Sequence, residues 1–165
     1  MKIIKPFKPI LITLLVLLVA PSSSALAKRP ASKQAPEAEF KALIDRYYAA
    51  WNTMNTANAD QFYAKDADLV FYDIAPLKYN NWAEYKEGVQ KAFFDTATSA
   101  KLTPMNDLRV TRRGNIAWTT VTFHLSAALK AGGSIELDAR HTAIWENRGG
   151  KWVIVHEHIS APLPS

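Results

Sequence analysis

The chain has 165 residues, a length typical of one domain, with a net charge of +5 and no cysteine. Six basic residues and no acidic residue precede residue 34, which leaves 14 basic and 15 acidic residues in the rest of the chain. This balance removes the charge argument for nucleic-acid binding, which needs a basic face on the domain itself, so no nucleic-acid partner is expected, and the lack of cysteine excludes a disulfide-stabilised scaffold.

The first 27 residues have the three parts of a secretory signal peptide: three lysines, an apolar run at residues 10–20, and the small-residue cleavage pattern A-L-A at residues 25–27. The apolar run is about half of the roughly 20 residues that a membrane helix needs. We therefore expect a periplasmic or secreted protein that is free of the membrane after cleavage. Residues 28–36 predict a flexible tail, and residues 37–162 the folded domain.

Three helices are predicted in the first half of this domain. Apolar residues spaced by three and four from Phe40 to Met54 predict an amphipathic helix that opens at Pro36-Glu37. Residues 59–64 predict a second, short helix. The N-x-x-E pattern at residues 81–84 is typical of a helix cap, and it precedes the apolar stripe of a third helix that runs to Phe93.

The second half of the domain changes to the two-residue alternation typical of strands. After a first strand at residues 68–73, we expect four more, joined by short glycine-containing connections, at residues 101–112, 115–127, 134–146 and 151–160. Because helices precede an antiparallel meander, the predicted fold class is α+β. A long antiparallel sheet twists and coils, so a helix laid on one face encloses a cone whose open end can hold a small ligand.

Four segments, in chain order, resemble motifs of one superfamily. They are R-Y-Y-A-A-W-N at residues 46–52, F-Y-A-K-D-A at 62–67, F-Y-D-I-A-P-L at 71–77 and G-K-W-V-I-V-H-E-H-I-S-A-P at 150–162. The chain is therefore similar to SnoaL-like and ketosteroid isomerase-like proteins of the NTF2-like superfamily. The resemblance implies an NTF2-like cone, with three N-terminal helices packed on a strongly curved antiparallel sheet, and a homodimer that forms through sheet faces.

The resemblance also implies acid–base residues. Tyr47 matches the tyrosine that donates a hydrogen bond to the substrate oxyanion in ketosteroid isomerases, although a core tyrosine fits the helix stripe equally well. Asp73 lies within two residues of their general-base aspartate, or else it simply opens the turn into Ile74. The isomerases carry an acid on the third meander strand where this chain has His141, which argues against a true steroid isomerase. His141 is either an electrophilic donor or an exposed strand residue.

Arg140 and several aromatic residues are expected to bind the substrate. Arg140 shares a strand face with Asp138. If that face is concave, Arg140 holds an anionic or carbonyl group, and if it is convex, the two residues form a solvated pair. Among the aromatic residues, Trp51, Trp118 and Phe123 are predicted to line the pocket.

The last predicted strand carries two histidines on one face. His156 and His158 lie on the same side of the strand, with Glu157 on the other. We predict that His156 moves a proton and that His158 contacts the substrate, the alternative being two structural histidines. A metal site would need further ligands such as His124, and no cluster of cysteine or acidic residues supports one, so no metal is expected.

Two functions remain open at this stage. One is an isomerase, dehydratase or cyclase type of enzyme that acts on a small carbonyl compound by acid–base chemistry, and the other is a non-catalytic ligand-binding or protein-interaction module. The sequence has no glycine-rich phosphate loop and no nucleotide fingerprint, so no cofactor is expected. The predicted partner in either case is a small apolar or carbonyl-containing molecule.

Overall fold

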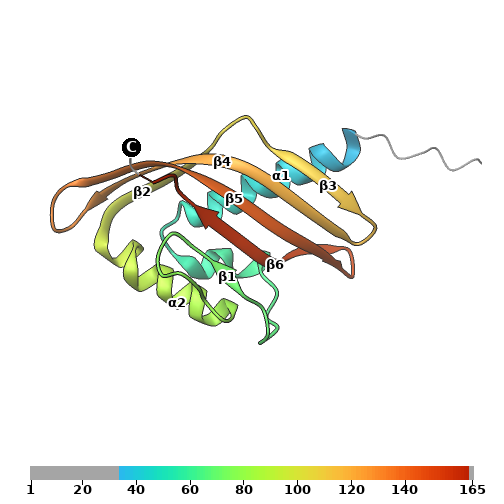
Figure 1. The fold of residues 1–165 in the computed structure, drawn as a ribbon, viewed down its shortest axis with the longest axis horizontal. Coiled ribbons are helices and arrows are strands. Elements are labelled where there is room, and N and C mark those ends of the chain that lie inside the picture. Colours follow the sequence, from blue (N-terminus) through green and yellow to red (C-terminus); the bar gives the residue numbers. More distant parts are fainter. Residues whose placement is uncertain (1–33, 164–165) are drawn as a thin grey trace, which may run out of the picture. The chain divides into compact units, whose positions relative to one another are not determined.

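A curved sheet bends around the first helix in the computed structural model, which describes residues 34–163 (Figure 1). The predicted signal peptide at residues 1–27 and the first part of the predicted tail lie outside the described residues. The helices are α1 (Gln34–Trp51), η1 (Thr56–Phe62), α2 (Trp82–Ala92) and η2 (Phe94–Thr96). The strands are β1 (Phe71–Tyr72), β2 (Ala97–Pro104), β3 (Arg109–Arg113), β4 (Ile116–Leu129), β5 (Ser134–Arg148) and β6 (Lys151–Ser160).

The helices lie close to where the sequence predicts them. Helix α1 begins two residues before Pro36, and its apolar stripe from Phe40 to Trp51 is buried against the sheet. The predicted second helix is the 3₁₀ helix η1. At the start of α2 the side chain of Asn81 accepts a hydrogen bond from the backbone of Glu84 at 2.9 Å, as the capping pattern predicts. Among residues 34–163, no helix is long and apolar enough to cross a membrane.

The sheet has the order β1-β6-β5-β4-β2, and β3 also pairs with β4. The expected α+β class and the three glycine-containing hairpin connections are confirmed. Two expectations need correction. The run at residues 101–112 forms two strands, β2 and β3, which both pair with β4, and the first strand is only the two residues of β1, which run parallel to β6. The sheet is therefore mixed rather than wholly antiparallel.

An extra residue in β6 reverses which side chains face the helices. Ile144 pairs with His156 while Trp145 pairs with Ile154, so Val155 has no partner on β5. Before this bulge the inward side chains of β6 stand at even positions, and after it they stand at odd positions. Because side chains alternate along a strand, one additional residue moves every later side chain to the opposite face.

The core lies between the inner face of the sheet and the helices, and it is rich in aromatic rings. Trp145 is completely buried, and its indole nitrogen donates to the hydroxyl of Thr119 on β4 at 2.9 Å. The rings of Tyr63 and Trp82 stack with centroids 3.7 Å apart, which joins η1 to α2. These contacts fix the helices over the concave face, where a cavity remains.

Gly88 of α2 provides a test of this packing. A Cβ atom there would lie 2.3 Å from Cε1 of Tyr79, and Tyr79 is itself held by two backbone hydrogen bonds to Phe71. We expect Gly88→Ala to lower the free energy of unfolding by about 1–3 kcal/mol because of overpacking, although alanine is favoured over glycine in a helix by about 1 kcal/mol. Urea denaturation measures the difference, with Glu87→Ala at the exposed neighbouring position as the control. A stabilised Gly88→Ala variant would show that Tyr79 is not fixed at this position.

Candidate functional site

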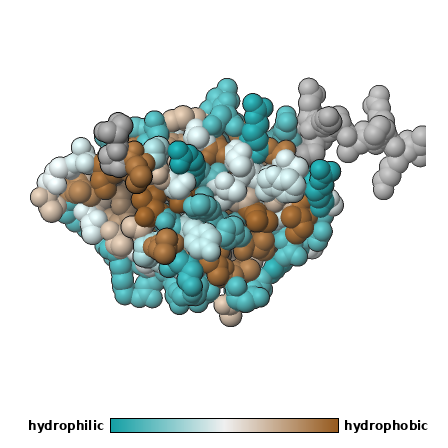
Figure 2. Space-filling view, viewed as in Figure 1, coloured by the Kyte–Doolittle hydropathy of each residue, from teal (hydrophilic) through white to brown (hydrophobic). Residues whose placement is uncertain are grey.

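A cavity of about 280 Å³ opens between α1, the segment after β1, α2 with η2, and the inner face of the sheet. Most of its lining side chains are aliphatic or aromatic. Figure 2 shows hydrophobic side chains gathered beside the β4–β5 hairpin, the part of the sheet that borders the cavity. Among the lining side chains of the described chain, those with a polar atom are Tyr47, Tyr48, Trp51, Asp73 and Tyr85.

Asp73 is the single acidic side chain in the lining of this cavity. It lies two residues after Phe71, which is fully buried on the inner side of β1, so alternation directs it inward as well. The backbone N–H of Ile74 donates to Oδ1 of Asp73 at 2.7 Å. Burial raises the pKa of Asp73 to about 6 in spite of this hydrogen bond, and the negative charge of Glu157 acts in the same direction. The carboxyl group therefore ionises near neutral pH.

Glu157 is completely buried on β6, behind the wall of the cavity. Its Oε1 accepts hydrogen bonds from Tyr85 at 2.8 Å and Tyr63 at 3.0 Å, and its Oε2 accepts one from Tyr47 at 3.0 Å. Nε2 of His141 contacts Oε2 at 3.3 Å. Three hydroxyls and one imidazole edge thus surround the two carboxylate oxygens, which together offer about four lone-pair sites. A buried carboxylate that only accepts hydrogen bonds needs donors arranged in this way.

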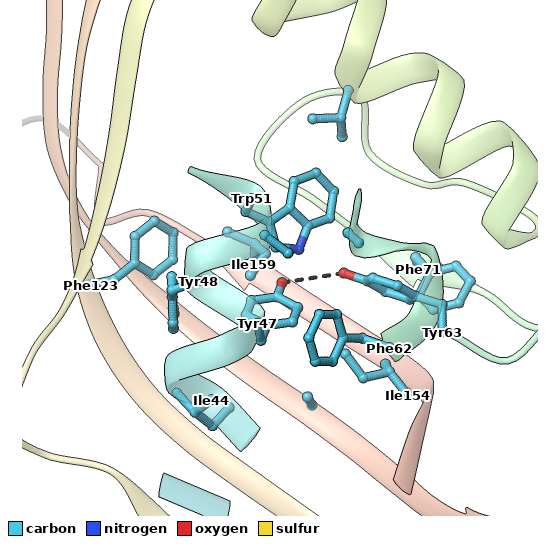
Figure 3. Packing of buried hydrophobic residues seen from close by; sticks show 14 of the residues in the cluster. Ile44, Tyr47, Tyr48, Trp51, Phe62, Tyr63, Phe71, Phe123, Ile154 and Ile159 are labelled. Carbon is cyan, nitrogen blue, oxygen red and sulfur yellow. Dashed lines mark hydrogen bonds between the residues drawn. The ribbon is translucent and has the colours of Figure 1, made fainter. Parts of the chain in front are cut away.

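The tyrosines around Glu157 keep their protons. Burial, together with the nearby negative charge of Glu157, raises the pKa of Tyr47, Tyr63 and Tyr85 well above its ordinary value, and the charge of Asp73 adds to the effect on Tyr85. The hydroxyls of Tyr47 and Tyr63 also lie 3.2 Å from each other, and Figure 3 shows the two side chains meeting from α1 and from the end of η1. These phenols are therefore protonated hydrogen-bond donors at neutral pH.

His141 extends the network to a second cavity residue. Its Nδ1 lies 3.1 Å from the hydroxyl of Tyr48, and its ring stacks on Tyr47 with centroids 5.0 Å apart. His141 is 1% exposed, so the interpretation as an exposed strand histidine is wrong. It faces inward on β5 because it lies two residues from both Ala139 and Ala143 and shares their buried face of the strand.

Comparisons with known proteins identify the family. The model of the SnoaL-like domain matches residues 40–164. The chain belongs to the SnoaL-like family. A search of curated proteins finds no match.

Solved structures agree with this SnoaL-like assignment. An NTF2-like superfamily protein from Salmonella enterica is 18% identical, with a TM-score of 0.73 over 81% of this chain and 96% of that one. A protein from Shewanella frigidimarina, provisionally named a ketosteroid isomerase, is 25% identical, with a TM-score of 0.59 over 72% of this chain and 92% of that one. A protein from Xanthomonas campestris, provisionally named a calcium/calmodulin-dependent kinase II association domain, is also 25% identical, with a TM-score of 0.64 over 77% and 88%. The expected NTF2-like cone is thereby confirmed.

This SnoaL-like chain differs from the isomerase pattern in the strand that carries its buried acidic residue. The resemblance places an acid on the third meander strand, where β5 carries His141. The structure supplies a carboxylate from the neighbouring strand instead, since Glu157 of β6 contacts His141. Tyr47 is both a core residue and a cavity-lining residue, and its hydroxyl donates to Glu157.

The two predicted histidines of β6 do not reach the cavity, and their predicted placement is wrong. The bulge at Val155 turns Glu157 inward and leaves His156 and His158 on the outer face of the sheet. His156 Nδ1 lies 2.7 Å from the backbone oxygen of Val70, and His158 is exposed beside Tyr72. Residues 152–155 are all apolar, so the sequence of β6 carries no alternation that could have revealed the bulge.

Arg140 and Trp118 also lie on the outer face, so their predicted contact with the substrate is wrong. Arg140 is exposed on the convex side of β5, and Trp118 alternates with buried Ala117 and Thr119 on β4 and is 39% exposed. Asp138 pairs with His124 rather than with Arg140.

Trp51 and Phe123 do line the cavity, as predicted. The residues that the sequence interpretation missed are Tyr48, Tyr85 and Glu157. Both tyrosines stand on predicted amphipathic helices, where a core position and a pocket position give the same pattern. No group of three or more histidine, cysteine or acidic side chains within residues 34–163 is arranged to hold a metal ion.

Glu157→Gln tests the buried network. The amide offers one acceptor oxygen and directs two N–H donors toward hydroxyls that already donate, so we expect the free energy of unfolding to fall by about 1–3 kcal/mol. Urea denaturation measures this, with Glu87→Gln on the exposed face of α2 as the control, for which a change within about 0.5 kcal/mol is expected. Equal stability of the two variants would contradict the role of Glu157 as the common hydrogen-bond acceptor of the three hydroxyls.

Proposed function

We propose that this SnoaL-like protein binds a compact, largely apolar molecule in the inner cavity and acts on it by acid–base chemistry, with Asp73 as the general base. The observation that carries the proposal is the position of Asp73 as the single carboxylate in the lining of an apolar cavity. Isomerases and dehydratases need a base of this kind, held close to a bound molecule and shielded from bulk water.

The protonation behaviour of Asp73 supports this role. A base works best when its pKa lies near the operating pH, because it is then ionised and still basic enough to accept a proton. Burial brings the pKa of Asp73 to about 6. Asp73 accepts a proton from the bound molecule and returns it to the same molecule at another atom, so that no other reactant is needed.

A specific observation favours a second candidate, a non-catalytic binding module. The Tyr47 hydroxyl, which the resemblance assigns to a substrate oxyanion, already donates to Glu157 at 3.0 Å. If this bond persists when a ligand binds, the cavity holds a base without the matching oxyanion donor, and binding need not lead to turnover.

A substrate-independent probe separates the two candidates. 5-Nitrobenzisoxazole is a neutral aromatic carbon acid whose ring opens once a base removes its C–H proton, and the product is coloured. We expect the protein to accelerate this reaction, with a rate that rises with pH through about 6 because the active form of Asp73 is the carboxylate. Asp73→Asn is expected to lower the rate by about 10²-fold or more.

The matched control is Asp68→Asn, which makes the same change at an exposed carboxyl outside the cavity. Its rate should equal that of the unmodified protein. No acceleration by the unmodified protein, or equal rates for the two variants, would refute the catalytic role of Asp73 and leave the binding module.

Export and dimer formation stay predictions that accompany this proposal. Cleavage after Ala27 would leave a mature chain that begins at Lys28, and intact-mass measurement of the protein from its natural compartment should give the mass of residues 28–165. A mass that includes residues 1–27 would contradict export by this signal. The sheet-face homodimer would use the outer face, where Trp118 and Tyr72 are each more than one-third exposed.

A further inference from the structure

The polarity of the cavity follows from where its hydroxyl protons go. Three tyrosines line it, and each hydroxyl has a single proton to donate. Tyr47 and Tyr85 direct theirs to the carboxylate of Glu157, at 3.0 and 2.8 Å. What these two hydroxyls can still offer to a ligand is a lone pair of electrons.

The direction of the hydrogen bond of the third tyrosine, Tyr48, depends on His141. Nε2 of His141 faces Glu157 at 3.3 Å, where an N–H is attracted to the carboxylate and a lone pair is repelled. A neutral imidazole that carries its proton on Nε2 has an acceptor at Nδ1. With that tautomer, the Tyr48 hydroxyl, 3.1 Å from Nδ1, donates to His141 and presents a lone pair to the cavity.

Trp51 carries the remaining polar side-chain atom among the tyrosines and tryptophan of the lining. Its indole nitrogen is buried and has no hydrogen-bond partner within the described chain. Figure 3 shows this nitrogen on the side of the ring that faces the hydroxyls of Tyr47 and Tyr63, whose rings lie about 6 Å away. The N–H is thus directed toward the Tyr47 and Tyr63 hydroxyls, and it forms no hydrogen bond with them.

The charge of the cavity points in the same direction. Asp73 lines it, Glu157 lies behind its wall, and none of its lining residues is lysine, arginine or histidine. Seven of the lining side chains are aromatic: Tyr47, Tyr48, Trp51, Tyr85, Phe93, Phe94 and Phe123. The faces of aromatic rings attract cations and a carboxylate attracts a charged N–H donor, so a cavity of this composition favours an ammonium group and disfavours an anion.

We propose, resting on the binding function above, that the ligand is a compact apolar or aromatic molecule that carries a hydrogen-bond donor, a protonated amine in preference to a hydroxyl, which it directs at Asp73. This narrows the expected ligand class. A carbonyl or carboxylate compound would meet the lone pairs of the Tyr47 and Tyr85 hydroxyls and the charge of Asp73.

A matched set of benzyl compounds tests the proposal. Benzylamine, benzyl alcohol, benzaldehyde and benzoate share one ring and differ in polarity, and toluene reports whether the cavity accepts the ring at all. Titrations of the purified protein at pH 8, where Asp73 is ionised, are followed by calorimetry or by NMR shifts. We expect benzylammonium to bind about tenfold tighter than toluene, benzyl alcohol to lie between the two, and benzaldehyde and benzoate to bind no better than toluene.

Two variants locate the donor contact. Asp73→Asn should remove the advantage of benzylammonium over toluene while toluene itself binds unchanged, and Asp68→Asn should change neither affinity. The inference is overturned if benzaldehyde or benzoate binds as tightly as benzylammonium, or if Asp73→Asn keeps the preference for the amine. Failure of toluene and every other probe to bind would instead refute the proposed binding function itself.

Discussion

The burial of one carboxylate determines how the interior of this protein is arranged. Glu157 has no exposed surface, and an ionised carboxylate in such a place must have its oxygens paired. The partners come from four different places in the chain: Tyr47 on α1, Tyr63 after η1, Tyr85 on α2 and His141 on β5. Both helices, the 3₁₀ segment and the sheet are therefore tied to a single side chain, and the cavity is the space left beside it.

The fold could largely be predicted from the sequence because periodicity determines it. The spacing of apolar residues in α1 and the capping residue Asn81 of α2 are local signals, and local structure follows them. The two-residue β1 could not be predicted in the same way, because its pairing with β6 joins residues more than 80 positions apart.

The site was harder to predict because one residue decides which side chains enter it. With regular alternation His156 and Glu157 simply occupy opposite faces, and nothing local says which face is inner. The bulge at the unpaired Val155 determines which face is inner. As a result the two predicted histidines lie outside the cavity, and Glu157, which was not predicted, is buried behind its wall. Tyr47 lies on the inner side because it follows the uninterrupted period of α1, and Asp73 lies there two residues after the buried Phe71 of β1.

The two carboxylates of the interior have different roles because their surroundings differ. The oxygens of Glu157 accept hydrogen bonds from three hydroxyls and contact an imidazole, and the side chain has no exposed surface that a ligand could reach. Asp73 receives one backbone hydrogen bond, from its neighbour Ile74, and most of its acceptor capacity is open to the cavity. A fully paired buried acid is a structural element, and an incompletely paired acid in an apolar cavity is the group that a ligand must satisfy. Both the proposed chemistry and the proposed ligand polarity depend on this difference.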